Sequence, residues 1–141
     1  KAFFNAFPGV KDYMKDSIEK ARKKGYTETL LGRRRKIPEL LSSNFNLRQA
    51  GERQAMNAPI QGLAADIFKI ALVSVHKELK KKSYDSALVL QVHDEVILDV
   101  VPDELDSVKK IVKKNMENAY EISVDLKVDI AVGKSWAEAK S

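Results

Sequence analysis

The chain has 141 residues, of which 44% are hydrophobic and 32% are charged, and its formal net charge is +5. This length allows one domain with a hydrophobic core, and the composition is typical of a soluble protein. The absence of cysteine excludes a disulfide framework, a thiol nucleophile and a cysteine zinc site. No apolar run approaches the roughly 18 residues of a membrane span, and no signal-peptide pattern is present, so we expect an intracellular protein with no membrane partner.

Positive charge is concentrated at the beginning of the chain. Residues 1–53 contain 13 Lys/Arg and 6 Asp/Glu, whereas residues 94–141 contain 7 Lys/Arg and 11 Asp/Glu. This asymmetry indicates a polyanion as the partner of the basic end, although solvated lysine-rich helices with no such partner are also common.

A helix and a basic hairpin are predicted first. Residues 1–26 contain a helical pattern that starts after Pro8 and ends at Gly25. Residues 27–38 predict a hairpin whose second strand carries four consecutive cations, Arg33-Arg34-Arg35-Lys36. These cations repel one another, and a polyphosphate partner would relieve the repulsion. The alternative is an exposed edge strand that its charges protect from pairing with another chain.

A long helix is predicted for residues 46–82, with Asn46 as a plausible N-cap. Pro59 lacks an amide donor and clashes with the preceding turn, so we expect a kink or a short break there. A row of hydrogen-bond donors follows the helix at intervals of four: Arg53, Asn57 and Gln61. Periodicity alone slightly favours an ordinary solvated stripe over a binding surface.

Residues 87–100 predict two strands that meet at a tight turn. Alternation places Leu88, Leu90 and Val92 on one face of the first strand. Three ionisable residues occupy the tip: His93, Asp94 and Glu95. His and Asp tolerate unusual turn angles, but these groups are costly to place at a buried tip. The pattern leaves a ligand or metal site and a plain turn equally open.

The last elements are a helix at 103–121 and a strand at 123–132, which alternates strictly between apolar and polar residues. The sole tryptophan, Trp136, is expected to pack the C-terminal tail. We therefore predict an α+β fold in which the 87–100 hairpin and the last strand belong to one antiparallel sheet. The long helix and the 103–121 helix are expected to cover one face of this sheet.

Several segments resemble motifs of one enzyme family. Residues 91–95, Gln-Val-His-Asp-Glu, resemble motif C of the family A DNA polymerases. Other segments resemble further motifs of this family in the same order: residues 7–10, 25–30, 32–35, 52–53, 57–62, 64–67 and 133–136. The resemblance covers essentially the whole chain. Because the chain begins without Met and with three Phe in its first seven residues, we expect it to be a piece of a longer polymerase.

The resemblance implies a palm-type sheet and template-directed transfer of deoxynucleotides to a primer 3′ end with two Mg²⁺ ions. Asp94 would share both ions with an aspartate from another strand. His93 would lie against the primer end, and Glu95 would have a supporting role. The implied partners are primer–template DNA, deoxynucleoside triphosphates and the rest of the parent polymerase.

The resemblance also gives the polar row a role. Arg53, Asn57 and Gln61 would face the minor groove of the primer–template duplex, where the acceptors of different base pairs lie in nearly the same places. Arg33 and Arg34 would contact the phosphate backbone. A bacterial protein of this kind would act in the cytoplasm, in association with the nucleoid.

The sequence also departs from the family pattern. It contains no counterpart of the first catalytic aspartate motif or of the nucleotide-binding helix. We therefore expect residues 1–141 to be the C-terminal part of a palm domain with some adjoining fingers-side structure. The second metal site would be incomplete, the chain alone inactive, and one sheet edge exposed. The alternative is a non-catalytic, sequence-tolerant DNA-binding module or an inert structural fragment.

Overall fold

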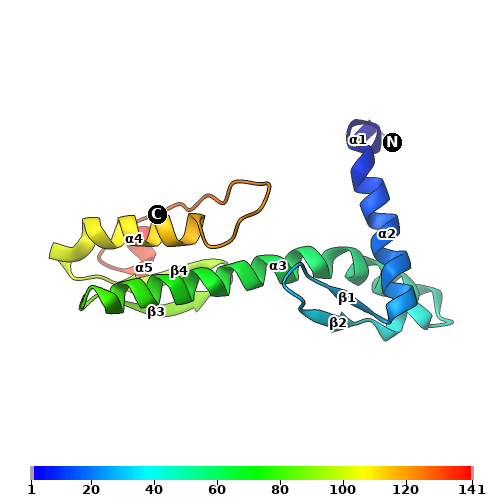
Figure 1. Cartoon of the computed structure of the whole chain (residues 1–141), viewed down its shortest axis with the longest axis horizontal. Helices are drawn as coiled ribbons and strands as arrows, with labels where there is room; N and C mark the ends of the chain where they lie inside the picture. Colours follow the sequence, from blue (N-terminus) through cyan, green and yellow to red (C-terminus); the bar gives the residue numbers. More distant parts are fainter. Residues whose placement is uncertain (1, 141) are drawn as a thin grey trace. The chain divides into compact units, whose positions relative to one another are not determined.

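The computed structural model describes residues 2–140 and contains two compact units, whereas the chain length suggested one domain. The first unit extends to Asp66 and the second begins at Ile67. Each unit has its own cluster of buried apolar side chains and pairs its own strands (Figure 1). Each therefore has an internal source of stability.

The first unit consists of helices around a short hairpin. Its elements are α1 (Ala2–Ala6), α2 (Pro8–Lys24), β1 (Tyr26–Glu28), β2 (Arg34–Lys36), the 3₁₀-helix η1 (Pro38–Leu41) and the first part of α3, which begins at Phe45. The predicted hairpin is confirmed, because β1 and β2 pair antiparallel with Tyr26 opposite Lys36. Gly25 ends α2 at a φ of 77°, a left-handed conformation that glycine adopts at little cost.

The core of the first unit joins α2, the residues around η1 and α3. Its buried side chains are Ala21, Ile37, Leu40 and Ala55. At Gly51 the backbone of α3 lies against η1, and a Cβ atom there would be 2.9 Å from the Leu40 amide nitrogen. The contact therefore requires a residue without a side chain.

The prediction at Pro59 was a kink or a short break, and the helix α3 spans Phe45–Lys81 with Pro59 inside it, so there is no break. Proline removes one backbone hydrogen bond and crowds the preceding turn. The Tyr13 hydroxyl of α2 donates a hydrogen bond of 3.0 Å to the Met56 carbonyl, one turn before the proline. This contact joins α2 to α3 beside Pro59, and a sequence pattern does not reveal such a contact between helices.

Two further properties of α3 differ from the sequence prediction. The Asn44 Oδ1 atom accepts a hydrogen bond of 2.9 Å from the Asn46 amide, so the capping side chain is Asn44 and not Asn46. One 18-residue stretch of α3 has a mean hydropathy of 1.4, which is enough to cross a membrane by length and composition. This corrects the expectation that no such stretch exists. It is weak evidence for a membrane, because core helices of soluble proteins also reach this value.

The second unit packs two helices against the second hairpin. After the last part of α3, its elements are β3 (Ala87–Val92), β4 (Glu95–Asp99), the 3₁₀-helix η2 (Pro102–Glu104), α4 (Leu105–Glu117) and α5 (Trp136–Ala139). The core side chains are Val75, Leu79, Val108, Ile111 and Val112, with Leu88, Leu98 and Val100 packed against them. Figure 1 shows α4 alongside the C-terminal part of α3. The predicted cover of the hairpin by these two helices is therefore confirmed.

A β-bulge changes the faces of β3. Leu88 pairs with Leu98, but Leu90 pairs with Ile97, so Val89 is an extra residue on its strand. Cross-strand partners share a face, and the two partners Ile97 and Leu98 are adjacent on β4, so their side chains point to opposite faces. Leu88 and Leu90 therefore also lie on opposite faces. The prediction of one shared face was wrong, and 49% of Leu90 is exposed.

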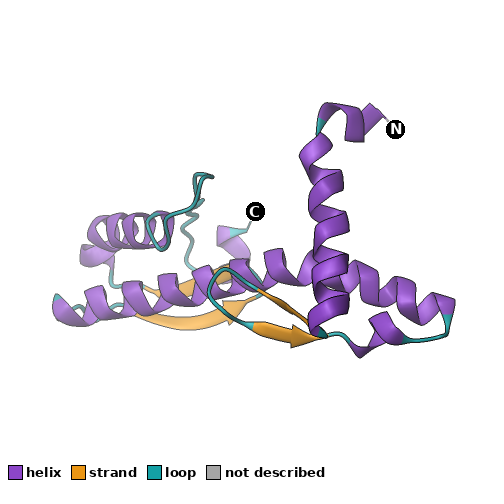
Figure 2. Cartoon of the chain, turned by 45° about the vertical axis from the view of Figure 1, so that its right-hand side comes forward, coloured by secondary structure: helices purple, strands orange, loops and turns teal. Residues whose placement is uncertain are grey.

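The predicted strand at 123–132 is absent. Figure 2 draws the segment between α4 and α5 as loop, and the strands of residues 2–140 form only the pairs β1–β2 and β3–β4. Alternation identifies a segment with one apolar face, but a strand also needs a neighbour that pairs with its backbone groups. No described strand pairs with this segment, so the predicted sheet is reduced to its hairpin.

The carboxylate of Glu104 connects the two ends of the second hairpin. It accepts hydrogen bonds from the Ser86 hydroxyl at 2.5 Å, the Ser86 amide at 3.0 Å and the Asp85 amide at 3.2 Å. The Ser86 hydroxyl oxygen in turn accepts from the Val101 amide at 3.0 Å. The bond from the Ser86 side chain is the main cause that lowers the pKa of Glu104.

Replacing Glu104 with Gln should lower the thermal unfolding midpoint by a few degrees at neutral pH. A carboxyl group whose pKa is lowered by folding stabilises the protein above its ordinary pKa, and this stabilisation is lost as the pH falls through the folded pKa. The difference between Glu104→Gln and the original chain should therefore shrink in acid, as measured by circular dichroism melts. Asp103→Asn is the control, and an equal effect of both substitutions would contradict the assignment.

Replacing Gly51 with Ala should lower the free energy of unfolding by about 1–3 kcal/mol, because the new methyl group would press on the backbone of η1. Urea unfolding measures the change. Gly9→Ala is the matched control, because no atom lies within 4 Å of a Cβ atom there and alanine favours the helix. Stabilisation by both substitutions would show that α3 and η1 are not in close contact.

Candidate functional site

The predicted catalytic residues lie at the tip of the second hairpin. His93 and Asp94 form the turn between β3 and β4, and Glu95 begins β4 opposite Val92. His93 has a φ of 54°, in the left-handed region that residues with side chains rarely adopt. Two-residue hairpin turns require a positive φ at this position, so the turn itself accounts for the conformation of His93. The tip is exposed, which removes the desolvation cost expected for a buried turn.

The two acids of the tip differ in their contacts. The Asp94 carboxylate makes no hydrogen bond or ion pair with another residue of the described chain. The Glu95 Oε1 atom lies 3.0 Å from the Lys140 Nζ atom, a contact that the sequence did not reveal. Asp94 therefore has the free carboxylate. Within residues 2–140, no group of three or more His, Cys, Asp or Glu side chains could hold a metal ion.

The polar row on α3 is continuous and free. Because the helix is unbroken at Pro59, Arg53, Asn57 and Gln61 remain four residues apart on one side of it, over about 12 Å. All three side chains are exposed, and none bonds to another described side chain or backbone group. Their donors are available to a partner.

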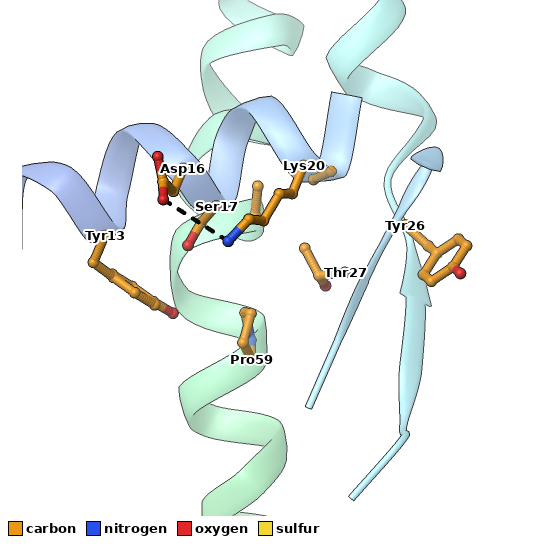
Figure 3. A pocket seen from close by; sticks show the side chains of 9 residues that line it. Tyr13, Asp16, Ser17, Lys20, Tyr26, Thr27 and Pro59 are labelled. Carbon is orange, nitrogen blue, oxygen red and sulfur yellow. Dashed lines mark ion pairs between the residues drawn. The ribbon is translucent and has the colours of Figure 1, made fainter. Parts of the chain in front are cut away.

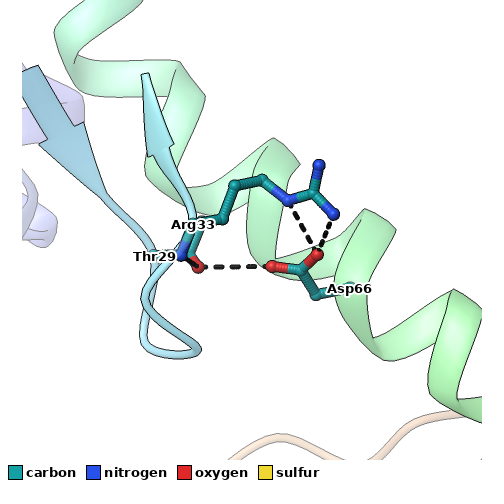
Figure 4. Close-up of polar contacts among 3 residues, drawn as sticks. All are labelled: Thr29, Arg33 and Asp66. Atoms are coloured by element: carbon teal, nitrogen blue, oxygen red, sulfur yellow. Dashed lines mark hydrogen bonds and ion pairs between the residues drawn. The ribbon is translucent and has the colours of Figure 1, made fainter. Parts of the chain in front are cut away.

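The first arginine of the basic hairpin is bound within its own unit. The Arg33 Nε atom donates to Asp66 Oδ1 at 2.7 Å, and the Thr29 hydroxyl donates to Asp66 Oδ2 at 3.3 Å (Figure 4). This pairing raises the pKa of Arg33, chiefly through the hydrogen bond. A Cβ atom on Gly62 would lie 2.7 Å from the Thr29 Cγ2 atom, so glycine lets the hairpin reach α3.

The next two arginines also have partners. Arg34 pairs with Glu28 across the hairpin, and its guanidinium lies 4.9 Å from the Tyr26 ring centroid. Arg35 donates to the Gln54 side chain at 3.1 Å. The carboxylates of Glu28 and Asp66 thus relieve the repulsion that the sequence argument assigned to a polyphosphate.

A pocket of about 250 Å³ lies in the first unit and was missed by the sequence analysis. Its labelled lining residues are Tyr13, Asp16, Ser17, Lys20, Tyr26, Thr27 and Pro59 (Figure 3). The Lys20 Nζ atom lies 3.8 Å from Asp16 Oδ2. The pocket is lined by residues of α2, β1 and α3, which come from separate segments of the sequence. No single segment could therefore predict it.

The comparisons with known proteins identify the same family as the sequence motifs. The model of DNA polymerase family A matches residues 1–138. The chain is 51% identical over 140 residues to DNA polymerase I of Lactococcus lactis subsp. lactis and 50% identical over 138 residues to DNA polymerase I of Bacillus subtilis. These alignments cover 99% and 98% of this chain, but only 16% of each relative.

A solved structure is similar over nearly the whole chain. It is the POL domain of Pol1 from M. smegmatis in complex with DNA primer–template and dNTP, with a TM-score of 0.94 and 47% sequence identity. The match covers 99% of this chain and 24% of that chain. Together, the matching family model, the bacterial relatives and this structure show that the chain belongs to DNA polymerase family A.

Proposed function

We propose that this chain forms part of the active site of a DNA polymerase that adds deoxynucleotides to a primer 3′ end. The observation that carries the proposal is the exposed carboxylate of Asp94 at a hairpin tip, which has no partner among the described residues, in a chain of this family. The solved relative was bound to primer–template DNA and dNTP, and these would be the partners here. Because the chain spans 16% of the curated relatives, the complete activity would involve the rest of a longer polymerase.

Asp94 would hold a divalent cation, Mg²⁺ in this proposal. One exposed carboxylate fits Mg²⁺, which takes few protein ligands and keeps waters and substrate phosphates. The bound ion would supply Lewis-acid stabilisation of phosphoryl oxygens. In this proposal residues outside this chain would complete the site for two ions, since no group of three or more His, Cys, Asp or Glu side chains within residues 2–140 could hold a metal ion. His93 would lie against the primer end, and Glu95 would support the tip.

The row of Arg53, Asn57 and Gln61 would read the minor groove of the duplex. All three side chains offer N–H donors, and the minor groove presents acceptors of every base pair in nearly the same places. Their freedom from intramolecular contacts supports this role, because no existing bond would have to break. Such contacts would tolerate any sequence but respond to a misshapen base pair.

Arg33 and Arg34 would contact the phosphate backbone while keeping their present partners. A guanidinium group has five N–H donors, and each of these arginines uses only some of them on its carboxylate. The remaining donors of two exposed side chains could bind phosphate oxygens. In this proposal residues 1–141 are the C-terminal part of a palm domain with adjoining fingers-side structure, in a bacterial cytoplasm.

A second candidate is a non-catalytic DNA-binding module. The lack of a metal-binding cluster within residues 2–140 favours it, together with the free donors on α3. This module would bind duplex DNA, and Asp94 would have no role in that binding. Experiments that separate DNA binding from metal binding therefore distinguish the two candidates.

The chain should bind a fluorescently labelled primer–template duplex with an affinity that falls steeply with salt, because phosphate contacts release counterions. Arg53→Ala should weaken the binding by about tenfold. Fluorescence anisotropy over a salt series measures both effects. Lys11→Ala is the control, because it removes one exposed charge from α2, far along the sequence from the polar row. An equal loss of DNA affinity in both variants would show that Arg53 acts only through the net charge of the chain.

Mn²⁺, a paramagnetic substitute for Mg²⁺, should broaden the NMR signals of the amides at the hairpin tip. Asp94→Asn should abolish the broadening, whereas Asp99→Asn, which changes another exposed acid of β4, should preserve it. DNA binding without broadening at the tip would favour the non-catalytic module. Mg²⁺-dependent primer extension by the chain alone would contradict the incomplete second metal site.

A further inference from the structure

The C-terminal segment forms a closed turn beside the hairpin tip. The helix α5 has four residues, too few to be stable alone. Its N-cap Ser135 accepts a hydrogen bond from the Glu138 amide at 3.3 Å, and Glu138 Oε2 accepts from the Lys134 amide at 3.0 Å. A Cβ atom on Gly133 would lie 2.7 Å from the Ala139 nitrogen, so the segment folds back tightly on itself.

Lys140 connects this segment to the tip. Its Nζ atom lies 3.0 Å from Glu95 Oε1 and 5.1 Å from the centroid of the Trp136 ring. The ammonium group therefore has a carboxylate of β4 and an aromatic ring of α5 as neighbours, an arrangement that favours a cation. Glu95 and Val92 form the last cross-strand pair before the turn. The contact between Lys140 and Glu95 therefore restrains the residue that directly follows Asp94.

The consequence of this contact is local. The side chains of Lys140 and Glu95 are 53% and 45% exposed, and an exposed ion pair contributes little to global stability. The ion pair with Lys140 does, however, orient the Glu95 carboxylate toward α5. Without Lys140, the tip would carry two adjacent free acids, and a cation could bind either or both of them. With Lys140 in place, only the Asp94 carboxylate is free.

We propose that Lys140 is a positioning residue for the hairpin tip, which holds the Glu95 carboxylate against α5 so that Asp94 alone is presented to a divalent cation. This inference rests on the proposed function only in the role that it gives to Asp94. The contact between Lys140 and Glu95 can be tested independently of any metal ion.

The first experiment compares the backbone amide shifts and hydrogen exchange of residues 92–96 in the original chain and in three variants of it. Lys140→Met should shift these signals and speed exchange about two- to fivefold, since an exposed pair is weak. Lys134→Met, which removes the same charge from the same segment, should leave them unchanged. The reciprocal pair Glu95→Lys with Lys140→Glu should restore the original pattern. Unchanged signals in Lys140→Met would overturn the inference.

The second experiment measures Mn²⁺ affinity at the tip by electron paramagnetic resonance. Lys140→Met should tighten binding about threefold because Glu95 becomes a second available acid, and the added change Glu95→Gln should reverse this gain. Lys140→Arg and Lys134→Met should bind as the original chain does. Weaker or unchanged binding in Lys140→Met would overturn the positioning role. Absence of Mn²⁺ binding in the original chain would refute the proposed role of Asp94, and the amide data would still decide whether Lys140 holds Glu95.

Discussion

A proline inside a helix removes one backbone hydrogen bond, and the first unit depends on how the chain accommodates Pro59. The helix α3 continues through Pro59, and the Tyr13 hydroxyl of α2 donates a hydrogen bond to the Met56 carbonyl in the preceding turn. A break would rotate the side chains that follow relative to those that precede it. The continuous helix keeps Arg53 and Gln61, which lie on either side of the proline, in one row.

Charged groups of the chain fall into two classes according to their contacts. Arg33 and Arg34 are bound to carboxylates of their own unit, and these pairs join the hairpin to α3 and one strand to the other. Among the described residues, Arg53 and Asp94 have no such partner. Folding therefore accounts for the positions of Arg33 and Arg34. Under the proposed function, DNA and a divalent cation would be the partners of Arg53 and Asp94.

The sequence predicted most elements because their signals are local. Alternating apolar residues identified the second hairpin, and helical periodicity identified α2, α3 and α4. The failures concern information that one segment does not contain. The strand at 123–132 has the right alternation but no described neighbour, and the bulge at Val89 depends on pairing with β4. The contact of Tyr13 with α3 beside Pro59 likewise comes from a different helix.

The same limit applies to the candidate site. Motif order located His93, Asp94 and Glu95, because neighbours along the chain remain neighbours at a turn. It could not show that Lys140 neutralises Glu95, since that contact depends on how the C-terminal segment folds back. The resemblance assigned the metal ions to Asp94 and a supporting role to Glu95, and among the described residues only the Asp94 carboxylate of these two has no partner. The difference between them arises from tertiary packing, and it makes Asp94 the better candidate for a metal ligand.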